Sequence, residues 1–438
     1  MPHSESMAGT ASAETAADSE RNPAKRFLKL LGPGLITGAS DDDPSGIGTY
    51  AQAGAAFGFP ILWTMFVTLP LMSAVQYICG KIGMVSGKGL AGVLREHYPR
   101  ALLYPAVILL VVANTINAGT DIGAIAAAFN LLLPVSIKLL IVPITLLIVA
   151  LQIWGSYRLI ARVFKWLSLT LFAYIGASFL AHPNWGQVLK STFIPHLSLD
   201  HDFLLMLVAI LGTTISPYLF FWQASQEVEE ETSMGRKTVA ARKGATDREL
   251  HVARLDTYIG MFFSNFVAYF VILASAATLH AAGQTNIQSA TEAAEALRPL
   301  AGSAATILFA IGLIGAGFLA VPVLTGSSAY AVAEMFGWKY GLDEKLRGAK
   351  QFYAIIAVST LVGMTINLLG INPITALFWT AVINGLLSPP LIIIIMLVAN
   401  NRRVLGARVN GRTTNILGWL TAAVMSAAAV GLLLTWNQ

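Results

Sequence analysis

The feature that most restricts the fold of this 438-residue chain is a series of long apolar stretches along nearly its whole length. About 20 apolar residues suffice to cross a bilayer as a helix, which satisfies its own backbone polar groups inside lipid. Hydrophobic residues make up 55% of the chain and charged residues 12%, unlike any soluble domain. We therefore predict an all-helical polytopic membrane protein. The eleven expected spans are 26–57, 60–85, 103–131, 136–155, 161–181, 203–230, 254–282, 303–335, 350–369, 373–399 and 413–436.

The distribution of lysine and arginine supports this span count and predicts an orientation. If the N-terminus is cytoplasmic and the spans alternate, all but three of the 28 basic residues fall in cytoplasmic segments, the exceptions being Lys138, Lys190 and Arg298. Cytoplasmic loops carry such an excess. We expect a multi-pass protein of the plasma (cytoplasmic) membrane, with its N-terminus inside and its C-terminus outside. Because topology accounts for the net charge of +5, no nucleic-acid partner is indicated.

The remaining segments have simpler interpretations. Residues 1–25 lack the apolar core of a signal peptide and are expected to be a disordered cytoplasmic tail, followed by a single transmembrane domain over 26–438. The lone cysteine, Cys79, excludes a disulfide framework. The acidic and basic stretch at 227–254 is predicted to be a solvated connector, and a gating or metal-sensing role is the alternative.

Two spans are interrupted by polar residues and proline. In the first, Asp41, Asp42 and Asp43 precede Pro44, and each carboxylate costs roughly 2.5–3.5 kcal/mol at membrane depth. In the sixth, small and hydroxyl residues precede a proline within 211–218. A proline kink alone would explain the second interruption.

The positions of the interruptions favour more than a kink. Spans one and six are corresponding members of two five-helix halves, and interrupted spans at corresponding positions mark the substrate sites of transporters built from inverted repeats. We predict that helices 1 and 6 are discontinuous. The repeats would cover about 26–181 and 203–399, with an extra helix at 413–436.

The side chains at the two breaks favour a hard cation. Asp43 could bind one directly, and Thr213, Thr214 and Ser216 supply further oxygens. Neither break contains methionine, histidine or cysteine, so Mg²⁺, Ca²⁺ or Mn²⁺ fits better than softer metals. Asp41 and Asp42 would point to other helix faces than Asp43. One or both could line a water-filled vestibule, or Asp42 could hold a metal ligand in position without binding the ion directly.

Other intramembrane polar residues have open roles. Asp121 could relay protons or pair with a buried donor, since a carboxylate within a span is functional by default. Asn384 is a possible ligand, although a buried asparagine more often satisfies a neighbouring helix. Asp256 and Asn265 lie in span seven, and Glu334 is expected to be interfacial.

Several motifs together resemble the NRAMP family of divalent-metal transporters. The resemblance covers most of the chain: Gly32-Pro33-Gly34 leading to Asp43-Pro44, the stretches 51–55, 57–58 and 81–90, and Asn401-Arg402-Arg403. It implies a LeuT-like fold of two inverted repeats and transport of metal by alternating access, often with protons.

The departures from the family pattern concern the metal site. The family motif Asp-Pro-Gly-Asn becomes Asp43-Pro44-Ser45-Gly46, and Met-Pro-His becomes Ser216-Pro217-Tyr218. A second family histidine falls on Gln223, and the acidic pair of helix 3 falls on Ala118 and Asp121. The thioether that favours Mn²⁺, Fe²⁺ and Cd²⁺ is therefore absent, together with half of the proton route.

The resemblance and its departures imply a member of the NRAMP-related magnesium transporter branch. It would import Mg²⁺ and also Mn²⁺, bound partly hydrated, without tight proton coupling. The expected metal ligands are Asp43, Gly46, Thr213 and Ser216, with Asp42, Ser45, Thr214, Gln223 and Asn384 as weaker candidates and Asp121 as a proton or accessory group.

The alternatives are a proton-coupled Mn²⁺/Fe²⁺ transporter, an organic-solute transporter of the same fold, and a receptor that has lost transport. An enzyme is not expected, because the chain has no phosphate-binding loop and its histidines lack zinc spacing. Beyond the transported ion and the lipid bilayer, no cofactor or obligate protein partner is predicted.

Overall fold

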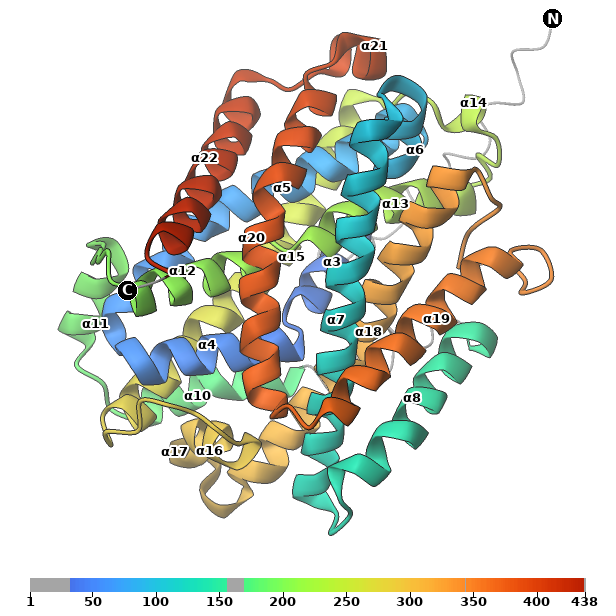
Figure 1. Cartoon of the computed structure of the whole chain (residues 1–438). Coiled ribbons are helices and arrows are strands. Elements are labelled where there is room, and N and C mark those ends of the chain that lie inside the picture. The colour runs from blue at the N-terminus through green and yellow to red at the C-terminus, as the bar shows by residue number, and fades with distance from the viewer. Residues whose placement is uncertain (1–31, 156–168, 343, 437–438) are drawn as a thin grey trace, which may run out of the picture.

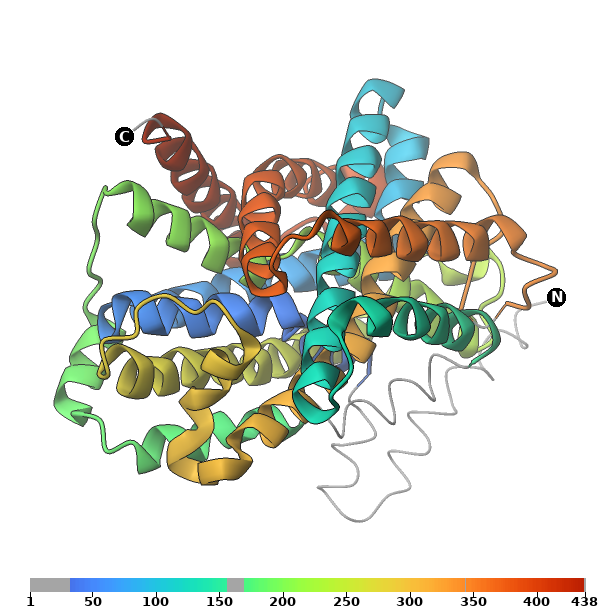
Figure 2. The same ribbon diagram turned by 60° about the horizontal axis from the view of Figure 1, so that its bottom comes forward.

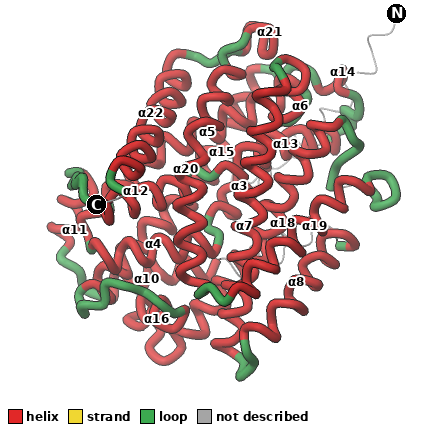
Figure 3. The backbone as a smooth tube through the Cα atoms, viewed as in Figure 1, coloured by secondary structure: helices red, strands yellow, loops and turns green. Residues whose placement is uncertain are grey.

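The described part of this computed structural model, residues 32–155, 169–342 and 344–436, consists of helices and loops alone (Figure 3). The helices are α3 (Pro33–Asp41), α4 (Pro44–Phe57), α5 (Trp63–Ser86), α6 (Leu90–His97), α7 (Arg100–Leu132), α8 (Ile137–Trp154), α10 (Ala173–Leu180), α11 (Trp185–Phe193), α12 (His201–Thr214), α13 (Pro217–Ser233), α14 (Val239–Arg242), α15 (Asp247–Ser275), α16 (Ala290–Ala294), α17 (Arg298–Ala301), α18 (Ala305–Phe336), α19 (Lys350–Ile366), α20 (Pro373–Ala399), α21 (Arg402–Leu405) and α22 (Arg412–Leu434). Within these ranges, nine helical segments are long and apolar enough to cross a membrane. The predicted all-helical membrane fold is confirmed.

The predicted spans agree closely with several observed helices. The range of α20 is the predicted 373–399, and α8 and α22 differ from their predicted ranges by one or two residues. The helix α15 begins earlier than predicted because Thr246 and Glu249 form a capping box at its N-terminus. The predicted tail at 1–25 and the first parts of spans one and five lie outside the described residues.

The prediction of a solvated connector starting at residue 227 is wrong in its first part. The helix α13 continues to Ser233, and the side chains of Glu227 and Glu231 on it are buried. The amphipathic pattern of the acidic stretch follows the helical period, so part of it faces the protein interior. Glu334, expected at the interface, is likewise buried and accepts hydrogen bonds from the backbone of Gly89 and Gly92.

The two predicted interruptions are present and have the same local cause. The first span divides into α3 and α4, with Pro44 as the first residue of α4, and the sixth divides into α12 and α13, with Pro217 as the first residue of α13. Proline is favoured at this position because its missing N–H has no partner there anyway. Both breaks lie inside the helical body.

Corresponding helices of the two halves pack against each other. The pairs are α5 with α15, α7 with α18, and α8 with α19, and the broken spans meet as α3 with α13 and α4 with α12. Figure 1 shows α7 beside α18, and Figure 2 shows α8 beside α19. This pairing agrees with the predicted repeats, each helix contacting the one five spans later.

Glycine pairs allow three of the helix contacts to approach at backbone distance. A Cβ atom on Gly38 of α3 would lie 2.3 Å from the carbonyl oxygen of Gly260 on α15. A Cβ atom on Gly119 of α7 would lie 2.3 Å from the carbonyl oxygen of Gly363 on α19. Likewise, one on Gly212 of α12 would lie 2.2 Å from the backbone nitrogen of Gly385 on α20. Small residues drive such close packing in membranes.

The molecule has two chemically distinct ends. The helices α6, α14 and α21 lie at one end, here called the basic end, and α10, α11, α16 and α17 lie toward the other, here called the opposite end (Figure 1). Three basic residues were predicted to lie outside the cytoplasm, and two of them, Lys190 and Arg298, are on α11 and α17 at the opposite end. Between the ends, large apolar side chains such as Leu139 and Trp154 are exposed, as a lipid-facing surface requires.

Candidate metal site

Asp43 lies at the junction of α3 and α4 and caps the second of these helices. Its Oδ1 accepts hydrogen bonds from the backbone nitrogen of Gly46 (2.6 Å) and from Ser45 Oγ (2.8 Å). Its Oδ2 accepts a hydrogen bond from Asn117 Nδ2 on α7 (3.2 Å). Aspartate is among the best residues at a helix N-terminus, so the sequence Asp-Pro fixes this carboxylate at the break.

The second break is held by hydroxyl groups. Ser216 Oγ lies 2.6 Å from the carbonyl oxygen of Thr213 and 3.0 Å from that of Gly212. Ser388 of α20 donates to the carbonyl oxygen of Ile215 (2.9 Å). These bonds satisfy carbonyl groups that the interruption releases.

Two tyrosines connect the breaks. Tyr50 of α4 and Thr214 of α12 share a hydrogen bond of 3.0 Å between their hydroxyl groups. Tyr218 of α13 donates its hydroxyl to the carbonyl oxygen of Ser40 on α3 (3.0 Å). The interruptions of helices 1 and 6 therefore face each other across a short distance.

The two breaks approach each other at Gly46, where no side chain separates Asp43 from Thr213. A Cβ atom on Gly46 would lie 3.0 Å from Thr213 Oγ1 and 3.2 Å from Asp43 Oδ1. Thr213 Oγ1 is buried and has no hydrogen-bond partner among the described residues. An ion placed here would meet a carboxylate from one break and a hydroxyl from the other.

The helix α7 contributes a third wall to this space. Asn117 and Asp121 lie one turn apart on the same face of α7. Asp121 is 0% exposed. Within the described part of the chain, both carboxylate oxygens of Asp121 and Oδ1 of Asn117 lack hydrogen-bond partners.

Asp41 and Asp42 are directed toward α15. Ser264 Oγ lies 2.6 Å from Asp41 Oδ2 and 3.2 Å from Asp42 Oδ1. Both carboxylates are buried, so they do not line the open vestibule considered for them above. They form a separate acidic pair on the basic side of the break.

The weaker candidates are scattered around the site. Ser45 donates to Asp43, and Asn384 lies on α20 beside Gly385, with its Nδ2 lacking a partner in the described ranges. Gln223 is the exception, because it lies two turns along α13 and donates to Glu227 (2.8 Å).

Sequence reasoning missed three neighbours of the site. Asn117 could have been found from its spacing of four residues to Asp121, and Tyr50 from the same spacing to Gly46. Ser264 carries no comparable signal, since it is one of many small residues in an apolar helix.

A vestibule of about 670 Å³ leads toward the site from the opposite end. Its lining comes from α4, α12, α20 and the loop at 285–287, and includes Gly48 and the carboxylate of Asp202. Gln52 holds the loop in place by accepting from Ile287 N (2.8 Å) and donating to the carbonyl oxygen of Thr285 (3.2 Å).

On the basic side, α3 covers the site. Asp256 of α15 accepts hydrogen bonds from the backbone nitrogens of Gly32 (2.9 Å), Gly34 (2.6 Å) and Leu35 (3.2 Å). With the contact of Gly38 on Gly260, these bonds hold α3 against α15. The site is therefore covered on the basic side, and Asp43 and Thr213 are each only 1% exposed.

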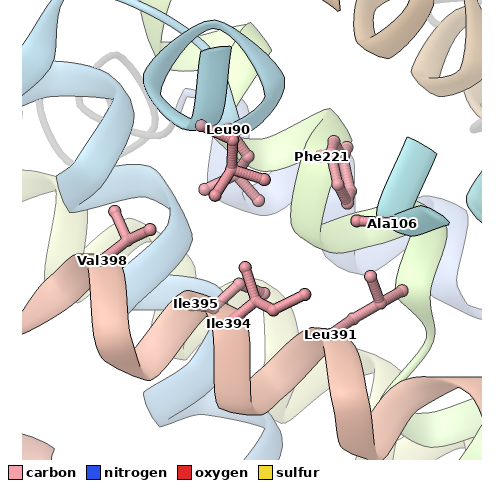
Figure 4. Close-up of a pocket in the computed structure, with 8 residues that line it drawn as sticks. Leu90, Ala106, Phe221, Leu391, Ile394, Ile395 and Val398 are labelled. Carbon is pink, nitrogen blue, oxygen red and sulfur yellow. The ribbon is translucent and has the colours of Figure 1, made fainter. Parts of the chain in front are cut away.

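A second cavity between α6, α7, α13 and α20 does not belong to the site. Figure 4 shows Leu391, Ile394, Ile395 and Val398 of α20 facing Leu90 and Phe221. Its volume of about 10 Å³ leaves space for no more than one water, and its lining offers no polar group to hold it.

The donor set at the breaks suits an ion that keeps part of its water. In the described ranges, no group of three or more His, Cys, Asp or Glu side chains is arranged to hold a metal. The site instead offers the carboxylate of Asp43, with that of Asp121 on the α7 wall, together with the Thr213 hydroxyl and amide and carbonyl oxygens, all of them hard ligands.

The chain is similar to known proteins over nearly its whole length. Residues 34–435 match the family model described as natural resistance-associated macrophage protein-like. The divalent metal cation transporter MntH of Klebsiella pneumoniae (strain 342) is 27% identical over 418 residues, covering 93% of this chain and 94% of that protein.

Solved structures identify the fold. A manganese transporter of Eremococcus coleocola, in complex with an aromatic bis-isothiourea compound, has a TM-score of 0.72 at 19% identity, covering 94% of this chain and 87% of that one. Mhp1, a nucleobase-cation-symport-1 family transporter in a closed conformation, has a TM-score of 0.57 at 16% identity, covering 93% and 91%. Both share the LeuT-like fold, which confirms the expected architecture.

Proposed function

The chain belongs to the natural resistance-associated macrophage protein-like (Nramp) family, and from this premise we propose that it imports Mg²⁺, and also Mn²⁺, as a secondary transporter. That it is a divalent metal cation transporter follows from the family and from its relatives. The preference for Mg²⁺, and membership of the magnesium-transporting branch, are our proposal.

One observation carries the proposal: Asp43 and Thr213 face each other across Gly46, where no side chain separates them. Mg²⁺ loses its water reluctantly and usually binds through one or two carboxylates while keeping several waters. A site with one directed carboxylate, hydroxyl and amide oxygens, and no side chain at residue 46 matches that requirement. The absence of sulfur and imidazole from both breaks lowers the advantage of softer metals.

Orientation and mechanism complete the proposal. The excess of lysine and arginine supports a cytoplasmic location for the basic end, and in this orientation the vestibule of about 670 Å³ would lie on the outer side. An ion would enter through this vestibule, bind between the breaks, and leave when α3 moves away from α15. The protein would lie in the plasma membrane.

Uptake of Mg²⁺ into proteoliposomes, with the internal pH recorded at the same time, tests this function. We expect saturable Mg²⁺ entry without matching acidification, compared with protein-free liposomes. If Cd²⁺ enters strongly at low concentration and Mg²⁺ does not, the Mg²⁺ assignment is wrong.

The alternative is a proton-coupled Mn²⁺/Fe²⁺ transporter. The observation in its favour is Asp121, a buried carboxylate beside Asp43 that could carry a proton. Acidification of the vesicles in proportion to metal entry, and its loss in Asp121→Asn, would select this alternative.

A paired substitution should shift selectivity toward softer metals. Ser216→Met adds a thioether at the second break, and Gly46→Asn fills the space beside Thr213 and Asp43. We expect the affinity for Cd²⁺ or Mn²⁺ to rise about tenfold relative to Mg²⁺, which corresponds to about 1.4 kcal/mol. Competition against Mg²⁺ uptake measures this ratio.

The matched control is Ser216→Leu with Gly46→Asn, since leucine has nearly the volume of methionine but no sulfur. An equal shift in the control would show that cavity size, rather than the thioether, sets the preference. No shift in either variant would count against the site.

A further inference from the structure

A second buried carboxylate lies between the metal site and the basic end. Glu227 is on α13, eleven residues after Ser216, or about 16 Å along the helix at 1.5 Å per residue. It is 5% exposed, and Gln223 Nε2 donates to its Oε1 (2.8 Å). A carboxylate at such a place requires a reason, because burying it without a counter-charge is costly.

Two buried glutamines, on α13 and α5, have amide atoms without hydrogen-bond partners among the described residues. Gln223 leaves its Oε1 without a hydrogen bond among the described residues, although it is 0% exposed. On α5, Gln76 is 1% exposed, and neither its Nε2 nor its Oε1 has a partner in the same ranges. Buried polar groups are nearly always satisfied, so the unpaired atoms of these two amides call for a partner that the described residues do not supply.

The geometry of α5 brings Gln76 toward the same place. Gly80 lies one turn further along the same face of α5. A Cβ atom on Gly80 would lie 3.3 Å from Glu227 Oε1 and 3.4 Å from Gln223 Nε2. This face of α5 therefore covers the pair formed by Glu227 and Gln223.

The charges around Glu227 favour a cation. The charged side chains nearest to it include Asp256, Glu230 and Glu231, all acidic. The nearby Arg236 forms ion pairs with Glu231 and Glu249 instead. In the described part of the chain, no basic side chain lies within ion-pair distance of Glu227.

We propose that Glu227, Gln223 and Gln76 form a second binding position for the transported dication on its way to the basic end. This proposal rests on the proposed function. Rotation of the Gln223 amide by a half turn would place its oxygen beside the Glu227 carboxylate, so that both oxygens face a partly hydrated Mg²⁺ or Mn²⁺. Asp256, which also holds α3, lies near this position. An ion that leaves when α3 moves would pass it.

The test compares transport from the two ends of the protein. Right-side-out and inside-out membrane vesicles of cells expressing Glu227→Gln are supplied with Mg²⁺, and the initial rate is measured against concentration. In vesicles in which Mg²⁺ is supplied to the basic end, we expect the KM to rise about tenfold. From the opposite end, the KM should stay unchanged and the maximal rate should fall. Glu227→Asp keeps the carboxylate, so its KM from the basic end and its maximal rate from the opposite end should lie closer to the wild-type values.

The control is Glu96→Gln, which removes a carboxylate from the exposed surface at the same end. The hydrogen bond from Lys88 lowers the pKa of Glu96, so this residue is charged in the native protein. Its neutralisation should leave both KM values unchanged. Unchanged or equally changed KM values from the two ends in Glu227→Gln would overturn the proposal.

A second variant covers the case in which Glu227→Gln does not fold. Gln76→Leu removes an amide without changing the charge, and the same one-sided rise in KM is expected. Failure of the proposed function is recognised separately: in that case the wild-type vesicles move no Mg²⁺. Wild-type transport with symmetric kinetics in both variants rejects the second position alone.

Discussion

Replacing Asp43 with asparagine should abolish Mg²⁺ uptake while the protein still folds. Asparagine caps a helix about as well as aspartate, so the bond from the backbone of Gly46 is retained. The negative charge is lost, and an NH2 group replaces the oxygen that accepts from Asn117, so the Asn117 amide must turn over to keep that bond. A carboxylate about 4 Å from a cation contributes about 4 kcal/mol per unit of ionic charge at an effective dielectric constant of about 20. We therefore expect transport to fall roughly a thousandfold or more.

Two further variants make this experiment specific. Asp43→Ala removes both the charge and the cap, so it should show the same transport loss with a stability lower by about 0.5–2 kcal/mol. Asp202→Asn neutralises a carboxylate in the vestibule lining and should have a much smaller effect. If Asp43→Asn transports normally, the metal site lies elsewhere.

Replacing Gly38 with alanine should stop the transport cycle by a different route. The added methyl group would lie 2.3 Å from the carbonyl oxygen of Gly260, a distance that forces α3 away from α15. Overpacking of this kind costs about 1–3 kcal/mol. Because the cost falls only on the state closed toward the basic end, we expect the maximal rate to fall about 10- to 100-fold.

A reporter cysteine checks the cause of this loss. Thr257 is buried under α3, close to Gly34. With the buried Cys79 replaced by serine, Thr257→Cys should react slowly with thiol reagents in the wild-type background and faster with Gly38→Ala. Gly411→Ala is the control, because nothing lies within 4 Å of its added methyl group. Equal labelling in both backgrounds would contradict the steric explanation.

The sequence predicted the fold because its strongest signals are physical requirements of the bilayer. Apolar length and the positions of Pro44 and Pro217 predicted the spans and both breaks, as the observed helices confirm. The predicted span at 203–230 includes Glu227, but its burial was not predicted, because charge suggests solvent whereas burial depends on the facing helix α5. No pattern in one sequence states which helix faces which.

The candidate site was predictable only in part for the same reason. Asp43 and Thr213 could be named from the breaks, but their approach depends on Tyr50 and Tyr218, which bond across the fold. Gln223 is an example. The family resemblance made it a candidate metal ligand, whereas in the structure it donates to Glu227, one helical turn further along α13.

The three backbone bonds to Asp256 bear on the kinetics of the protein. Hydrogen bonds to a charged group are worth about 1.5–3 kcal/mol each, and all three connect the same short helix to a single carboxylate. A partial tilt of α3 would break some of these hydrogen bonds without forming new ones. Intermediate positions are thus disfavoured, so single-molecule recordings should show abrupt jumps between two levels, and turnover should slow steeply on cooling.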